Sequence, residues 1–153
     1  MPTTRLDHTF TIAASPETVF AHLADPANYV GLSPLVVAVR DIRRAGDTVH
    51  YHAVERFRIL GKLPYDNVIA VTLAAKRNDP PHAEITGDVH SPGGVRMAYR
   101  FSIAPDGHGT AVTDTLWLRA PFGLRRFARS RARAVQLARS RVLTQRLAAH
   151  APS

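Results

Sequence analysis

Residues 119 to 149, RAPFGLRRFARSRARAVQLARSRVLTQRLAA, determine how the rest of this chain can fold. Pro121 suits the first turn of a helix, and no proline or glycine follows Gly123 within the stretch. The pattern predicts one helix of about 26 to 29 residues, roughly 40 Å long. Steps of four and three residues select a face made mostly of small side chains: Leu124, Ala128, Arg131, Val135, Ala138, Val142, Gln145 and Ala149, with Phe127 beside it.

The positive charge of the chain is concentrated in this helix. The formal net charge is +8, and from residue 115 onward there are nine arginines and no acidic residue. Residues 1 to 114 carry 11 basic and 12 acidic groups and are close to neutral. Two interpretations follow: the arginines form a solvated outer face, or they meet an anionic surface such as RNA or a membrane.

The sequence before the helix predicts short strands separated by turns. Ser15-Pro16-Glu17 predicts the start of a first short helix, and Asp25-Pro26 ends it and can begin a second. Strands are expected at 7–14, 36–44, 48–59, 65–75, 82–90, 95–103 and 110–119. This order predicts an α+β fold with a seven-stranded antiparallel sheet and its helices on one face.

The composition limits the kind of protein. A chain of 153 residues fits a single domain, expected here over residues 1–153. There is no cysteine, and no stretch approaches the roughly 20 apolar residues of a membrane span. A cytoplasmic location is expected. We find no phosphate-binding loop, nucleophile elbow, zinc-protease helix or dinucleotide motif, and we expect neither a cofactor nor a metal.

Several motifs resemble a known superfamily. They are FTIAASPETVFAHLADPANY at 10–29, SPLV at 33–36, GTAVT at 109–113, and the final helix entered through Pro121. Together they resemble the START-like superfamily, also called SRPBCC or polyketide cyclase/dehydrase-like, over nearly the whole chain. Tyr29 stands where relatives often have tryptophan, which we expect to alter packing more than chemistry. The resemblance implies the helix-grip fold, in which a curved sheet wraps a long C-terminal helix above a ligand cavity.

The alternation of side chains along each strand indicates what would line such a cavity. Inner faces are expected to carry large apolar groups with a few polar ones, as ligand pockets do. The candidate ligand-binding residues are Tyr51, Glu55, Phe57, Tyr65, Asn67, Ile69, Met97, Tyr99, Phe101, Asp114, Phe127, Arg131 and Val135.

Glu55, Asp114 and Arg131 are the charged residues expected on otherwise apolar inner faces. Burying an unpaired charge is costly, so each of them should be paired, solvated or bound to a ligand. One interpretation is a structural ion pair between Arg131 and either acid. The other is that Arg131 holds an anionic or carbonyl oxygen while Glu55, its pKa raised by burial, serves as general acid or base. These three are the best catalytic candidates.

Three kinds of function remain open at this point. The first is binding of a hydrophobic small molecule, such as a polyketide, isoprenoid, lipid or aromatic compound. The second is a cyclase, aromatase or dehydratase acting in the same cavity, and the third is an interaction with RNA or a membrane through the arginine-rich helix. Leu143 and Leu147, outside the expected face, permit a homodimer as well as a monomer. His50 and His52 could form a metal pair, but without a third ligand they are expected to be surface histidines.

Overall fold

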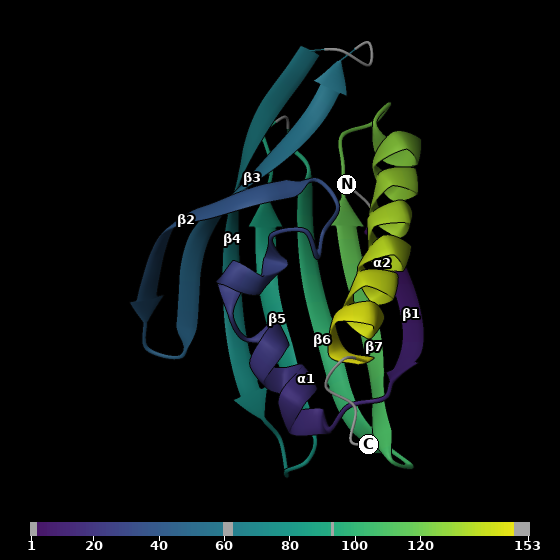
Figure 1. Cartoon of the computed structure of the whole chain (residues 1–153). Coiled ribbons are helices and arrows are strands. Elements are labelled where there is room, and N and C mark those ends of the chain that lie inside the picture. Colours follow the sequence, from purple (N-terminus) through teal and green to yellow (C-terminus); the bar gives the residue numbers. More distant parts are fainter. Residues whose placement is uncertain (1–2, 60–62, 93, 149–153) are drawn as a thin grey trace.

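The computed structural model describes residues 3–59, 63–92 and 94–148. Its strands and helices follow the predicted order closely (Figure 1). They are β1 (Thr4–Ile12), α1 (Pro16–Leu23), the 3₁₀ helix η1 (Pro26–Tyr29), β2 (Val36–Ala45), β3 (Thr48–Ile59), β4 (Leu63–Arg77), β5 (Ala83–His90), β6 (Arg96–Asp106), β7 (Gly109–Arg119) and α2 (Arg125–Ala148).

The seven strands form one antiparallel sheet in the order β1-β7-β6-β5-β4-β3-β2. Consecutive strands are neighbours, except that β1 closes the edge beside β7. The sheet curves around α2, and α1 and η1 lie on the same face toward one end (Figure 1). The expected α+β helix-grip fold is therefore confirmed. From β2 onward the connections between strands are short, so each strand pairs with the next.

Local signals explain how the short helices begin. The Ser15 hydroxyl accepts a hydrogen bond from the backbone N–H of Thr18 at 3.2 Å, and Pro16 occupies the first turn. The Asp25 carboxylate accepts one from the N–H of Ala27 at 3.0 Å at the start of η1. These caps satisfy backbone donors that would otherwise be unpaired at a helix start.

The buried face of α2 differs from the predicted one. The side chains that enter the core are Ala132, Gln136, Arg139, Ser140, Leu143 and Leu147. This face lies one residue away from the predicted positions, which is about 100° around a helix. The prediction followed small apolar residues, whereas the core face includes polar side chains that have partners. Leu143 and Leu147 are core residues, so the prediction that they could form a dimer contact is wrong. Ala149 lies outside the described residues.

Polar contacts fasten the later turns of α2 to the sheet and to η1. The Gln136 amide donates to the backbone oxygens of Leu6 at 3.2 Å and Asp114 at 2.9 Å. Near the helix end, the Arg146 guanidinium donates to the oxygens of Asn28 at 2.6 Å and Val30 at 2.7 Å. Helix, sheet and η1 are thus joined by side chains that donate to backbone carbonyls.

One glycine sets the shape of the sheet beneath α2. Gly87 on β5 lies opposite Tyr99 on β6, and the Tyr99 hydroxyl crosses it to donate to the oxygen of Thr72 on β4 at 2.8 Å. A Cβ at position 87 would come within 1.9 Å of that Thr72 oxygen. Only glycine leaves room for this crossing.

Candidate functional site

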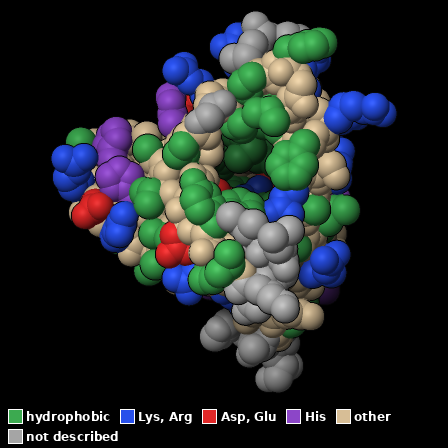
Figure 2. All heavy atoms as spheres, turned by 90° about the horizontal axis from the view of Figure 1, so that it is seen from above, with side chains coloured by type: hydrophobic (Ala, Val, Ile, Leu, Met, Phe, Trp, Pro, Cys, Tyr) green, Lys and Arg blue, Asp and Glu red, His purple; other side chains and the backbone are tan. Residues whose placement is uncertain are grey.

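A cavity of about 280 Å³ lies between α2 and the concave face of the sheet. Seen from above, it is a hollow framed by hydrophobic side chains, with basic side chains around its outer edge (Figure 2). Most of the lining is apolar. The polar or charged residues in the lining are Tyr29, Ser33, Tyr51, Glu55, Asn67, Ser91, Tyr99, Arg131 and Arg139.

Most of the predicted ligand-binding residues line this cavity. They are Tyr51, Glu55, Phe57, Asn67, Ile69, Met97, Tyr99, Phe127, Arg131 and Val135. Tyr65, Phe101 and Asp114 do not. Tyr65 is 52% exposed near the start of β4, whereas Phe101 is fully buried. The alternation assigned the inner face of the sheet correctly, but part of that face is core rather than cavity.

Asp114 is a structural residue rather than a cavity residue. Its Oδ2 accepts hydrogen bonds from Nε of Arg139 at 3.1 Å and from Nη2 at 2.6 Å. The Arg139 guanidinium carbon also lies 4.8 Å from the centre of the Phe101 ring. The predicted ion pair of Asp114 therefore exists, but its partner is Arg139 and not Arg131. Asp114 does not line the cavity, and its other carboxylate oxygen, Oδ1, is buried with no hydrogen-bond partner among the described residues.

Arg131 lies at the cavity mouth and not in a buried seam. Its side chain is exposed, with the guanidinium carbon 5.2 Å from the Phe57 ring centre and 5.9 Å from that of Phe127. A guanidinium between two aromatic rings is held without an ion pair. Arg131 therefore joins the α2 side of the mouth to the β3 side.

Glu55 belongs to a small polar group near the mouth. The Asn67 amide donates to Glu55 Oε1 at 3.3 Å and lies 3.3 Å from Ser91 Oγ. Burial raises the pKa of the Glu55 carboxyl, and the Asn67 hydrogen bond and the charge of Arg131 only partly oppose this. A carboxyl with a raised pKa at a cavity wall can hold or release a proton nearer neutral pH.

A second polar group lies deeper, at the sheet side of the cavity. Burial raises the pKa of the Tyr51, Tyr99 and Tyr29 phenols, so all three stay neutral. Tyr29 donates to the oxygen of Leu23 at 2.7 Å and Tyr99 to that of Thr72. Among the described residues, no hydrogen-bond partner is found for the Tyr51 hydroxyl, which lines the cavity beside Arg139.

The sequence prediction missed Arg139 and Ser91 as cavity residues. Arg139 could have been found from Leu143 and Leu147, because steps of four residues back from this leucine pair reach it. Ser91 follows the end of β5, where the periodicity of a strand no longer indicates direction. Tyr29 was noted only as a departure from its relatives, yet it is buried and lines the cavity.

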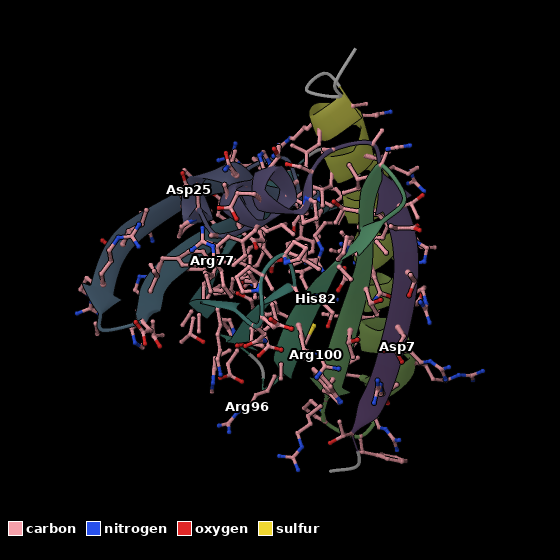
Figure 3. All side chains as sticks on the ribbon, turned by 90° about the horizontal axis from the view of Figure 1, so that it is seen from below. Asp7, Asp25, Arg77, His82, Arg96 and Arg100 are labelled. Carbon is pink, nitrogen blue, oxygen red and sulfur yellow. The ribbon has the colours of Figure 1, made fainter. Side chains whose placement is uncertain are left out.

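Several charged side chains of the sheet take no part in the cavity. Arg77 lies beside α1, where it pairs with Glu17 and stacks on Phe20, and Arg100 points away from the cavity (Figure 3). His52 pairs with Asp41 at 2.9 Å, while His50 is exposed. Within the described ranges, no group of three or more His, Cys, Asp or Glu residues could hold a metal ion.

The sequence matches a protein family over nearly its whole length. The model of the family described as polyketide cyclase / dehydrase and lipid transport matches residues 3–152. The chain therefore belongs to this family, and the START-like resemblance is confirmed. A comparison with curated proteins gave no significant match. None of the described helices is long and apolar enough to cross a membrane.

Solved structures of low sequence identity share the fold. A START superfamily protein from Mycobacterium smegmatis has a TM-score of 0.70 at 18% identity, covering 93% of this chain and 95% of its own. The Zhui aromatase/cyclase from Streptomyces sp. R1128 has a TM-score of 0.70 at 19% identity, covering 98% and 94%. A STAR-related lipid transfer protein from Xanthomonas axonopodis has 0.58 at 14%, covering 76% and 69%.

Proposed function

We propose that this protein binds a hydrophobic small molecule, such as a polyketide, isoprenoid, lipid or aromatic compound, in the cavity under α2. The observation that carries the proposal is a mostly apolar cavity with separate polar groups at its mouth and at its depth. Its volume of about 280 Å³ is just below the roughly 300–1,000 Å³ typical of ligand pockets. The family's association with cyclases and lipid transport supports the same class of ligand.

The two polar groups predict how the ligand is oriented. The deep group, Arg139 and the Tyr51 hydroxyl, offers a cation and a phenol to a carbonyl or hydroxyl oxygen. The mouth group, Glu55 with Asn67 and Arg131, offers a second polar contact. A ligand with oxygen functions at both ends of an apolar skeleton satisfies both groups, because each buried polar group needs a partner.

Ligand binding can be tested by filling the cavity. Native mass spectrometry of the purified protein checks for a co-purified molecule, and titration with the neutral fluorophore N-phenyl-1-naphthylamine (NPN) measures binding. Ala128→Trp places an indole in the lining, whereas Ala134→Trp places it on the exposed face of the same helix. We expect Ala128→Trp to weaken NPN binding at least 10-fold and Ala134→Trp to leave it unchanged. Equal binding by both variants would overturn the proposal.

A second candidate function is a cyclase, aromatase or dehydratase-type enzyme using the same cavity. The observation that favours it is Glu55, whose carboxyl has a raised pKa at the cavity wall. In this function Glu55 transfers a proton to or from the bound skeleton, while Arg131 or Arg139 stabilises the developing oxygen charge.

The enzyme function has a separate test. Glu55→Gln keeps the shape and the Asn67 contact but removes the ionisable proton. The co-purified molecule, or a linear poly-β-ketone offered as substrate, is incubated with each protein and its conversion is followed by mass spectrometry. Loss of turnover with unchanged binding supports catalysis by Glu55. Turnover at the wild-type rate in Glu55→Gln would exclude it, and binding without turnover in the wild type would leave only the binding function.

A further inference from the structure

Exposed apolar side chains gather at the cavity mouth. Phe122 is 96% exposed, Phe127 65% and Leu124 44% around the start of α2, while Leu63 and Tyr65 are exposed at the start of β4. Single exposed apolar residues are ordinary on a soluble protein, but a group of large ones at one end marks an interaction site. We call these five residues the apolar rim.

The two sides of the apolar rim belong to one surface. Tyr65 pairs with Phe57 across the β3–β4 ladder, and the Arg131 guanidinium lies between the rings of Phe57 and Phe127. Figure 1 shows the β3–β4 hairpin and the start of α2 at the same end of the molecule. Figure 2 looks directly onto this end and into the hollow between them.

Three arginines of α2 adjoin the rim. Arg125, Arg126 and Arg129 line a shallow groove with Phe122, and the described part of the chain offers them no ion pair or hydrogen bond. The sequence holds no acidic residue after Asp114 that could compensate them. At the opposite side of the mouth, Asp66 is bonded to Arg56. The net charge beside the rim is therefore positive.

The combination of the apolar rim with Arg125, Arg126 and Arg129 favours one kind of anionic partner over another. Nucleic acid would use the arginines and the aromatic rings, but it offers little to the aliphatic side chains of Leu63 and Leu124. An anionic lipid surface buries aromatic and aliphatic groups in its interface while its phosphates bind arginines. The long arginine side chains can keep their charges at the level of the lipid headgroups as the rim enters.

We propose that the apolar rim and Arg125, Arg126 and Arg129 dock this protein on an anionic lipid bilayer. In that orientation the cavity mouth faces the lipid, so a hydrophobic molecule passes between bilayer and cavity without crossing water. Docking does not depend on which molecule the cavity holds, and it goes beyond the proposed binding function. The arginine-rich helix α2 contacts the bilayer through its first turns, since Arg133, Arg139 and Arg146 form hydrogen bonds within the protein.

Co-sedimentation with lipid vesicles tests the docking surface. We compare vesicles of pure phosphatidylcholine with vesicles containing about one third phosphatidylserine, at low and high salt. The test variants are Arg125→Gln/Arg126→Gln/Arg129→Gln and, separately, Leu63→Ser/Phe122→Ser. The control is Arg40→Gln/Arg43→Gln/Arg44→Gln, which removes the same charge from exposed positions on β2. None of the replaced side chains lines the cavity.

The wild type and the control are expected to bind the anionic vesicles at least 10-fold more tightly than the neutral ones, and less tightly as salt rises. Both test variants should lose at least 10-fold of that affinity and still bind NPN. Equal loss in the control and the arginine variant would overturn the proposal. So would tight, rim-dependent binding to single-stranded RNA, or a dimer broken by Leu63→Ser/Phe122→Ser, if no vesicle binding is found.

Discussion

The first turns of α2 and its later turns are built for different purposes. From Ala132 onward the helix places Gln136, Arg139, Leu143 and Leu147 in the core and bonds to β1 and β7, while Val135 and Arg139 also line the cavity. Before that point its side chains line or overhang the cavity, and Arg131 touches the sheet side only through an aromatic ring. The difference shows how one element can be fixed at one end and leave room for a ligand at the other.

The largest effect is expected from Arg139, compared with Arg131. Arg139→Met leaves the Asp114 carboxylate buried without a cation, which costs about 3–5 kcal/mol of unfolding free energy. Arg131→Met changes an exposed side chain and should stay within about 0.5 kcal/mol. Urea denaturation monitored by circular dichroism measures both.

The double variant Asp114→Leu/Arg139→Met serves as the control for this comparison. Removing both charges leaves no unpaired ion, so it should recover most of the stability lost in Arg139→Met. Equal destabilisation by Arg139→Met and Arg131→Met would show that the later turns of α2 contribute no more to stability than its first turns.

A medium effect is expected from Gln136, compared with Gln145 on the exposed side of the helix. Gln136→Leu removes the donor to the Leu6 and Asp114 oxygens, which should cost about 1–3 kcal/mol. Gln145→Leu makes the same change at an exposed position and should be nearly neutral. Chemical denaturation of the pair checks this, and similar stabilities for the two variants would contradict it.

A smaller, pH-dependent effect is expected from Glu55. Because burial raises its pKa in the folded state above the reference value of 4.5, ionised Glu55 makes the folded protein less stable at neutral pH. Glu55→Gln should therefore be more stable than the wild type at pH 7. The gain should shrink as the pH falls through the folded-state pKa toward 4.5.

Glu17 provides a control of opposite sign for this pH series. Its hydrogen bond with Arg77 lowers its pKa, so Glu17 stabilises the fold above its unfolded pKa and loses this as the pH falls. Glu17→Gln should be the less stable protein at pH 7. Parallel pH dependences in the two variants, measured by urea denaturation from pH 3.5 to 7, would contradict the burial of Glu55.

The smallest effect on stability is expected at the cavity mouth. Phe127→Ala removes an exposed ring, so the unfolding free energy should change by no more than about 0.5 kcal/mol. Phe127 lines the cavity, however, and NPN affinity should fall several-fold. Phe122→Ala, which lies outside the lining, should leave both unchanged. Loss of stability in Phe127→Ala without loss of NPN binding would show that Phe127 stabilises the fold and does not contact the ligand.

The sequence predicted the fold well because its signals were local. Ser15 and Asp25 cap the two short helices as predicted. Strand alternation also assigned the inner faces of β3 and β7 correctly. Each of these features depends on neighbours a few residues away. The order of strands then followed from short connections.

The helix phase could not be read in the same way. Whether the face with Val135 or the face with Gln136 and Arg139 is buried depends on which groups of the sheet lie opposite the helix. The carboxylate of Asp114 and the oxygen of Leu6 make the polar face the buried one. Those partners are more than twenty residues away in the chain, so apolar periodicity chose the wrong face in the later turns. The ligand-binding role of the cavity residues stays a prediction.

The crossing of Gly87 by Tyr99 limits how this cavity can change over evolution. Any larger residue at position 87 would collide with the Thr72 oxygen and displace the tyrosine, so substitution at this position cannot change the sheet side of the cavity in small steps. The roof has no such constraint, because Ala128 and Val135 can exchange for larger or smaller side chains in steps. Selectivity among ligands in related chains is therefore expected to vary along the helix while the crossing of Gly87 and Tyr99 is kept.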